Sequence, residues 1–367
     1  MARAYKFTGS SGGRVNGGAV WAFNIIMSAS WSCLAFLLLS LVESNDALKV
    51  AVTGATGNVG RRVVQNLVAN GAQAKILLRH AVQEEGLSSS DLSAPPPADA
   101  DSKAVARYLV NLAGVEAVKG DINDQASLDA LLAGCSAVIA AHGARRTRKL
   151  SDFWIDPTTD PSHAKNVNYE GVRKLLAAAR ASQACKRIVR ITGKGEEPWS
   201  IFSILINGLG GMAKAWNNEG ERLLRAAEDV DYTIIRPGVM RGSEEDLAEN
   251  SLQLADDGGD LKVTAIPHGS IAKLCVEALD YPNAARTTLT AMQSEVPGSG
   301  ADTWKELLAG VQPDRREFRT DLLASHFTAV RVGCTALALA LGSIAFGLAT
   351  AMKVIWVKLA ALLFAGK

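Results

Sequence analysis

The segment VAVTGATGNVGRRVV, residues 50–64, decides the fold of this chain. An apolar run predicts a buried strand, and Gly54, Gly57 and Gly60 follow it before an amphipathic helical pattern. In this context glycines allow a tight turn and the close approach of a diphosphate, and the helix start offers free N–H groups. We therefore expect a dinucleotide to bind along this turn, at Thr53, Gly54, Ala55, Thr56, Gly57, Asn58, Val59 and Gly60.

Outward from this turn, short apolar runs alternate with amphipathic helical patterns. The expected strands are 48–54, 74–80, 115–121, 137–143, 187–193 and 232–238, and the expected helices are 60–71, 125–134, 168–182 and 218–229. Such alternation is typical of a parallel sheet that is covered by helices on both faces. The sequence therefore predicts an α/β fold, a doubly wound parallel Rossmann sheet over 48–311. Residues 239–311 are expected to form a small C-terminal lobe on the substrate side.

The composition excludes several classes of protein. The chain has 367 residues, of which 48% are hydrophobic and 21% charged, so it is neither a disordered chain nor a multi-span transporter. Lys and Arg number 39 against 37 Asp and Glu, which leaves no basic excess for nucleic acid. Five scattered cysteines indicate neither a disulfide framework nor a metal site.

The choice of dinucleotide depends on the end of the second expected strand. Arg79 stands there, where an acidic residue would bind the 2′-hydroxyl of NAD. A basic residue suits the 2′-phosphate of NADP, and Arg61 could share that phosphate. The sequence therefore predicts NADP(H) in preference to NAD(H).

The two ends of the chain differ from its middle. Residues 1–42 contain no acidic residue, and an apolar run covers 25–42. The segment 1–47 can therefore be a secretory signal, a signal anchor, an organelle transit segment or a hydrophobic helix docked on the domain. Residues 332–352 carry no charge and are long enough to span a bilayer as a helix. We expect 312–331 to be a linker, 332–352 a transmembrane helix and 353–367 a tail, with charges on both sides that leave the orientation open.

Four segments carry a resemblance to a known family: TGATGNVG at 53–60, GD at 120–121, NYEG at 168–171 and DYTIIRPG at 231–238. They resemble the atypical short-chain dehydrogenase/reductase superfamily, in its NmrA-like branch, which includes plastid import-associated and photosystem-assembly proteins. The resemblance implies that Asp121 and Ile122 lie by the adenine. It also implies that Ala140, Ala141 and Gly143 line the path to the nicotinamide, with Pro237 and Gly238 near its carboxamide.

The chain departs from that family at the catalytic pair. Active members carry Tyr-x-x-x-Lys, whose tyrosine passes a proton to the substrate carbonyl. If Glu221 is the family's glutamate, the lysine position holds Asn217 and the tyrosine position holds Ala213, while Lys214 is out of register. Thr192 matches the family's serine and could donate to a carbonyl, and His142 could deliver a proton.

Two functions therefore remain open from the sequence. The first is a membrane-tethered NADP(H)-binding subunit or assembly factor, with little or no catalysis. It would sit in an organelle membrane, a plastid being favoured over the endoplasmic reticulum or mitochondrion. It would contact the bilayer through 332–352 and join a larger membrane complex. The second is an NADPH-dependent oxidoreductase that reduces a carbonyl, quinone or flavin.

Overall fold

The computed structural model describes residues 48–80, 95–97, 99–144, 159–242, 251–296 and 298–364, all within one compact unit. Its main sheet has eight strands in the order β3-β2-β1-β4-β5-β6-β10-β8. They are β1 (Lys49–Thr53), β2 (Gln73–Leu78), β3 (Val115–Lys119), β4 (Ala137–Ala140), β5 (Arg187–Ile191), β6 (Asp231–Pro237), β8 (Leu252–Ala255) and β10 (Thr287–Gln293). Only β8 among these is antiparallel to its neighbour. The order reverses at β1, which confirms the doubly wound fold.

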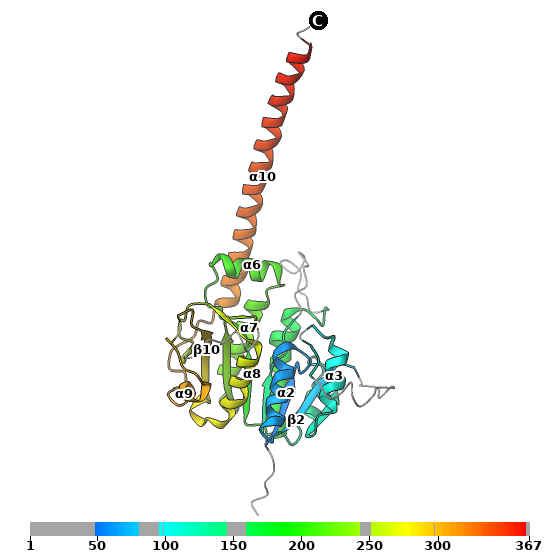
Figure 1. Cartoon of the computed structure of the whole chain (residues 1–367), viewed down its shortest axis with the longest axis vertical. Helices are drawn as coiled ribbons and strands as arrows, with labels where there is room; N and C mark the ends of the chain where they lie inside the picture. The colour runs from blue at the N-terminus through cyan, green and yellow to red at the C-terminus, as the bar shows by residue number, and fades with distance from the viewer. Residues whose placement is uncertain are drawn as a thin grey trace, which may run out of the picture. The chain divides into compact units, whose positions relative to one another are not determined.

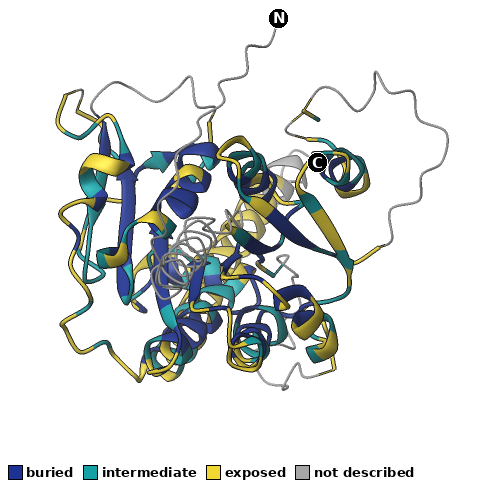
Figure 2. Cartoon of the chain, turned by 90° about the horizontal axis from the view of Figure 1, so that it is seen from below, coloured by how far each residue is buried: buried dark blue, intermediate teal, exposed yellow. Residues whose placement is uncertain are grey.

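Helices cover the sheet in two layers (Figure 1). One layer contains α2 (Asn58–Ala69), α3 (Ser102–Val110), α8 (His268–Glu277) and α9 (Trp304–Leu308), and the other contains α4 (Gln125–Leu132), α5 (Gly171–Ser182) and α7 (Ala213–Arg225). Val50 and Val52 of β1 pack in the first core, whereas Ala51 between them packs in the second. The inner strands are thus buried on both sides, and Figure 2 shows most of the strands as buried.

Segment 239–311 continues the main sheet. Its strands β10 and β8 lie beyond β6, and α8 packs on α2. A two-stranded sheet of β7 (Val239–Met240) and β9 (Ala265–Ile266) is the part that stands apart. The remaining short elements are η3 (Lys165–Glu170), a π-helical turn before α5, with η5 (Ala278–Asp280), η6 (Pro282–Ala284) and α6 (Ile201–Leu209).

The stretch 312–331, which the sequence predicts to be a linker, makes hydrogen bonds to the domain. The Asp314 carboxylate accepts hydrogen bonds from the Thr288 N–H at 2.7 Å and the Tyr232 hydroxyl at 3.1 Å. Asp257 Oδ1 accepts from the backbone N–H groups of Arg315 and Arg316. These contacts tie the chain to the edge of the sheet before the last helix begins.

That last helix, α10 (Leu322–Phe364), is longer than the predicted span 332–352 at both ends. His326, Ala329 and Val330 are buried where α10 packs on α6 and α7, whereas Val332 and most residues after it are exposed. Figure 1 shows α10 starting beside α6. Over Leu322–Leu359 the helix is long and apolar enough to cross a membrane. The N-terminal segment 1–47 lies outside the described residues.

Strand β3 forms one edge of the sheet and carries charge. Glu116 is half exposed on this strand and pairs with Lys49 Nζ at 2.6 Å and Lys75 Nζ at 3.2 Å. The pairing lowers the pKa of Glu116, chiefly through the hydrogen bond from Lys49. Lys119, at the end of β3, is exposed too.

Candidate nucleotide-binding site

The glycine turn that joins β1 to α2 leaves no room for side chains at two of its positions. Gly54 has a left-handed backbone, with φ of +73°, and a Cβ placed on it would lie 2.6 Å from the backbone N of His142. A Cβ on Gly60 would lie 2.1 Å from the Gly54 carbonyl oxygen. Because neither position can accept a side chain without a backbone shift, both glycines are required by the turn itself.

The start of α2 is open to an anion. Its N-cap is Gly57, which is exposed and has no side chain to cap the first N–H groups. The first turn, 58–61, contains no acidic residue. Free N–H groups and the positive end of the helix dipole suit a diphosphate. The residues present therefore fit the diphosphate of a dinucleotide.

The two expected arginines lie in different environments. Arg79 is exposed just after β2, where it is accessible to a ligand. Arg61 is buried, and its guanidinium donates to the Pro97 carbonyl and to Asn58 Oδ1, each at 2.9 Å. Burial lowers the pKa of Arg61. The Arg61 side chain is thus engaged in holding the loop before α3 against α2.

The expected adenine residues follow β3. Asp121 is half-buried, and its Oδ1 accepts from the backbone N–H of Asn123 at 2.9 Å. Ile122 is buried against Gly171, where an added Cβ would lie 2.8 Å from the Ile122 side chain. Both residues lie at the carboxyl end of a strand, which is where ligands bind in open parallel sheets.

On the expected nicotinamide side, β4 ends at Ala140 and the chain continues through Ala141, His142 and Gly143. His142 is buried, and its Nδ1 lies 2.6 Å from the Thr53 hydroxyl of β1. Burial holds the pKa of His142 well below 6.5, and the nearby Arg190 cation lowers it further. The ring is therefore neutral at pH 7 and a poor source of a proton. Gly143 is exposed at the end of this stretch.

Arg190 is a site residue that the sequence reasoning missed. Its side chain is 1% exposed, and its guanidinium donates to the backbone carbonyls of Ala140 and His142 and, at 3.2 Å, to Asn217 Oδ1. Burial lowers the pKa of Arg190 to about 10, so it remains charged at pH 7. An arginine within an apolar parallel strand was the available signal, because a buried charge needs partners.

Pro237 and Gly238 stand at the end of β6. Pro237 is buried. A Cβ on Gly238 would lie 2.2 Å from the Thr264 carbonyl oxygen, and the Gly238 N–H donates to Ala291. Close packing against the segment before β9 therefore explains this glycine without a ligand.

Thr192 directly follows β5 and donates its hydroxyl to Glu221 Oε1 at 2.6 Å. Glu221 is fully buried on α7, and its carboxylate also accepts from Arg225 and from both Nε and Nη2 of Arg236. Burial alone would raise the pKa of Glu221, but the arginines and the hydrogen bonds lower it to about 2. The Thr192 hydroxyl thus donates to a carboxylate that stays ionised at pH 7.

The positions of the missing catalytic pair lie on α7. Ala213 is half-buried at its first residue, and Asn217 accepts from Arg190 one turn later. Lys214 turns to α6, where its Nζ donates to Ser203 Oγ at 2.6 Å. Burial lowers the pKa of Lys214 to about 8. Asn217 is thus contacted from the sheet by the buried guanidinium of Arg190.

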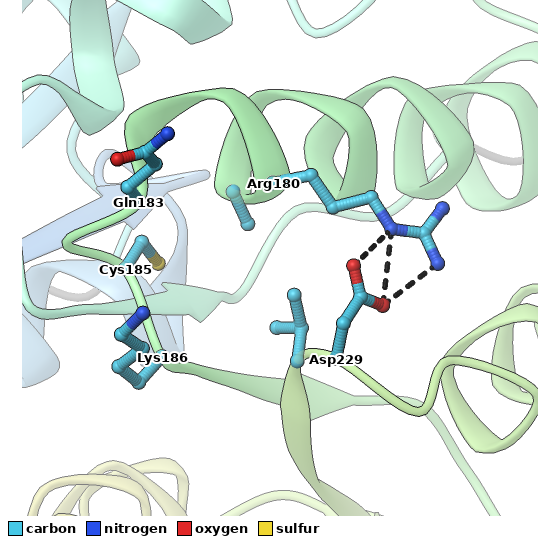
Figure 3. A pocket seen from close by; sticks show the side chains of 7 residues that line it. Arg180, Gln183, Cys185, Lys186 and Asp229 are labelled. Atoms are coloured by element: carbon cyan, nitrogen blue, oxygen red, sulfur yellow. Dashed lines mark hydrogen bonds and ion pairs between the residues drawn. The ribbon is translucent and has the colours of Figure 1, made fainter.

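A separate cavity of about 280 Å³ is shown in Figure 3. Its lining includes Gln183, Cys185, Lys186 and the Arg180–Asp229 ion pair, in which Arg180 Nε lies 2.8 Å from Asp229 Oδ2. These residues precede β5 and β6, at the edge opposite the glycine turn. The cavity is therefore no part of the candidate site.

Comparisons with known proteins bear on the family of the chain. A family of NAD(P)H-binding proteins matches residues 98–282, which follow the glycine turn. An uncharacterized chloroplastic protein of Arabidopsis thaliana is 24% identical over 277 residues, 72% of this chain and 75% of its own. The chloroplastic protein TIC 62 of Pisum sativum is 27% identical over 54% of this chain and 34% of its own. A ceramide reductase of Caulobacter vibrioides is 28% identical over 56% of this chain and 50% of its own.

The chain thus spans half or less of the length of two of these relatives. Among solved structures, an oxidoreductase of Lactococcus lactis aligns with a TM-score of 0.49 at 18% identity, over 71% of this chain and 95% of that one. The family match covers about half of the residues, and the sheet order and the glycine turn agree with it. The protein therefore belongs to the NAD(P)H-binding family of Rossmann-fold proteins.

Proposed function

We propose that the protein is a membrane-tethered NADP(H)-binding subunit or assembly factor with little or no catalysis of its own. The proposal that a nucleotide binds depends on one observation, the close packing of the glycine turn. A Cβ on Gly60 would lie 2.1 Å from the Gly54 carbonyl oxygen, and the start of α2 beside this contact has no side-chain cap. The chain's own residues bind and orient the nucleotide there. Bound NADPH would supply a hydride.

NADP(H) in preference to NAD(H) is supported by charge. Arg79 is exposed after β2, and the next residue is His80, so no carboxylate follows this strand directly to bind a 2′-hydroxyl. A 2′-phosphate adds two negative charges that an accessible guanidinium can bind in a bidentate manner. Arg61 contributes less to this choice than expected, because its side chain is held by Pro97 and Asn58.

The proposal of little or no catalysis is supported by the state of the candidate proton donors. Thr192 gives its proton to Glu221, and the His142 ring is neutral and bound to Thr53. Ala213 and Asn217 stand where the family has its catalytic pair. A carbonyl that accepts a hydride needs a proton at once, and none of these groups is suited to provide it.

An NADPH-dependent oxidoreductase is the second candidate. It is supported by the 28% identity to a ceramide reductase. A quinone or flavin acceptor would draw its protons from water, which removes the need for a tuned tyrosine. In that case the neutral His142 ring would position the acceptor and would not protonate it.

The proposed location is an organelle membrane, and a plastid is favoured. The support comes from the chloroplastic proteins among the relatives and from the apolar helix α10. Membership in a larger membrane complex remains part of the proposal. Affinity purification from mild detergent extracts would test it, and a monomer without partners would argue for the oxidoreductase.

The nucleotide is tested by titrating the full chain in nanodiscs with NADPH and NADH. We expect NADPH to bind at least tenfold tighter, about 1.4 kcal/mol. Arg79→Asp should abolish that preference, whereas Lys186→Asp, at the opposite edge of the sheet, should leave it unchanged. Equal affinities would overturn the choice of NADP(H), and absence of binding by both would overturn the proposed function. Oxidation of NADPH by a carbonyl, quinone or flavin would favour the second candidate.

A further inference from the structure

Helix α6 buries its polar side and exposes its apolar side, the opposite of a surface helix on a soluble domain. Ser203 and Asn207 are fully buried on its inner face. Trp199, just before the helix, and Ile201, Phe202, Leu205 and Leu209 along it are between 46% and 77% exposed. We call these five side chains the apolar face of α6. A helix on a soluble domain normally buries its apolar stripe and exposes its polar one.

Hydrogen bonds from the inner face hold α6 in this orientation. Ser203 Oγ accepts from Lys214 Nζ at 2.6 Å, and Asn207 Oδ1 accepts from the backbone N–H groups of Lys214 and Ala215. Asn207 Nδ2 lies 3.0 Å from Nδ1 of the buried His326. A rotation that buried the apolar face would break this whole set, so the exposure of that face is built into the fold.

The apolar face of α6 is continuous with the exposed part of α10. A Cβ on Gly333 would lie 2.9 Å from Ile204 Cγ2, and one on Gly208 would lie 3.6 Å from Cys334 Sγ. The helices therefore touch where the uncharged run of α10 begins, at Val332. Cations flank this level: Lys214 Nζ lies 5.7 Å from the Phe202 ring centre, and the Arg331 guanidinium lies 5.6 Å from that of Phe327.

We propose that the apolar face of α6 inserts into the surface of the lipid bilayer that α10 crosses. This inference rests on the proposed membrane tether. An apolar stripe at the level where a span begins, with a tryptophan at one end and cations beside it, matches the chemistry of the headgroup region. A bilayer would cover this face and the first exposed turns of α10 together.

The consequence is a fixed orientation of the candidate site. Thr192 directly follows β5, and residues 193–200 lead from it to α6. His326 of α10 contacts the same connection, with Nε2 3.0 Å from the Gly195 carbonyl oxygen. Insertion of α6 therefore holds the carboxyl edge of β5 close to the headgroups. A molecule that reaches the site from that side would be an amphiphile resident in the membrane.

The test measures the depth of α6 with a fluorophore on Leu205→Cys, in the full chain with Cys33→Ala and Cys334→Ala. The labelled protein is placed in phosphatidylcholine nanodiscs of three kinds: without bromine, with lipids brominated near the headgroup, and with lipids brominated deep in the acyl chain. Two further labels complete the set: Leu341→Cys within α10 and Glu116→Cys on the distant edge strand β3. We expect at least twofold quenching at position 205, quenching at 341 by deeper bromines, and none at 116.

Quenching at 341 without quenching at 205 would overturn the inference and leave the tether intact. It would mean that a protein surface covers α6, whether a partner, a second copy or the N-terminal segment of this chain. Absence of quenching at both 205 and 341 would overturn the tether and the inference with it. NADPH binding, measured on the same samples, reports the nucleotide part of the proposed function independently.

Discussion

Thr192 Oγ1 lies 2.6 Å from Glu221 Oε1, so the hydroxyl at the end of β5 faces a buried carboxylate. Glu221 is ionised, since Arg236 and Arg225 hold its pKa at about 2 despite its burial. A hydroxyl that donates to a charged acceptor makes one of the stronger protein hydrogen bonds. The relationship therefore gives Thr192 a role in stability that does not require a substrate.

Thr192→Val should lower stability and leave nucleotide binding intact. The variant keeps the shape but removes a donor to a charged group, which costs about 1.5–3 kcal/mol. Denaturant unfolding should show this loss, and the NADPH dissociation constant should stay within about twofold. Thr192→Ser retains the hydroxyl and should restore most of the stability. A variant with unchanged stability and lost turnover would instead support a catalytic Thr192.

Glu221→Gln should destabilise the protein by about 3–5 kcal/mol at pH 7, because it leaves buried Arg236 and half-buried Arg225 short of a counter-charge. The effect depends on pH in a defined direction. The folded pKa of Glu221 is about 2 and its ordinary value is 4.5, so its contribution is complete above 4.5 and is lost as the pH falls through 2. Unfolding curves of the two proteins should therefore converge as the pH is lowered from 5 toward 2. A difference in the free energy of unfolding that stays constant from pH 5 to pH 2 would contradict an ionised Glu221 as its source.

Gly60→Ala should abolish NADPH binding. The new methyl group would lie 2.1 Å from the Gly54 carbonyl oxygen, so the turn must open. Overpacking of this kind costs about 1–3 kcal/mol of stability. The control is Gly310→Ala, whose methyl group meets nothing closer than 3.8 Å, and it should bind NADPH normally. Isothermal titration would decide, and tight binding by Gly60→Ala would remove the assigned diphosphate cradle.

His326→Leu should loosen the start of α10. The histidine contacts Asn207, Asn218 and the Gly195 carbonyl, and a leucine would leave these buried polar groups without that partner. Backbone hydrogen exchange should accelerate over 322–330 in His326→Leu. The control is Thr328→Ala, two residues further along α10, which should leave the exchange rate unchanged because Thr328 is exposed. Unchanged exchange in His326→Leu would show that apolar packing alone anchors the helix.

Much of the domain could be predicted because its signals are local. Six predicted strands from 48 to 238 match β1 to β6 within a few residues, since a buried parallel strand reads as a short apolar run between turns. The glycine turn was predictable for the same reason: its strand, its glycines and its helix are adjacent in sequence.

The remainder depends on contacts between distant segments. Nothing in the sequence of 312–331 shows that Asp314 will meet Thr288, so the sequence predicts a linker there. No helix is predicted from the sequence where α6 lies, and only the structure shows that Ser203 and Asn207 face inward. At the site, Thr192 looked like a free donor because its partner Glu221 lies 29 positions away on another element.

The charged edge strand has a consequence for pairing between copies of the chain. An open strand edge invites a neighbouring chain to add a strand to the sheet. On β3, Glu116 and Lys119 are exposed, and a second copy that paired with this strand would have to remove both charged side chains from water. These two side chains therefore disfavour edge-to-edge association of the sheets.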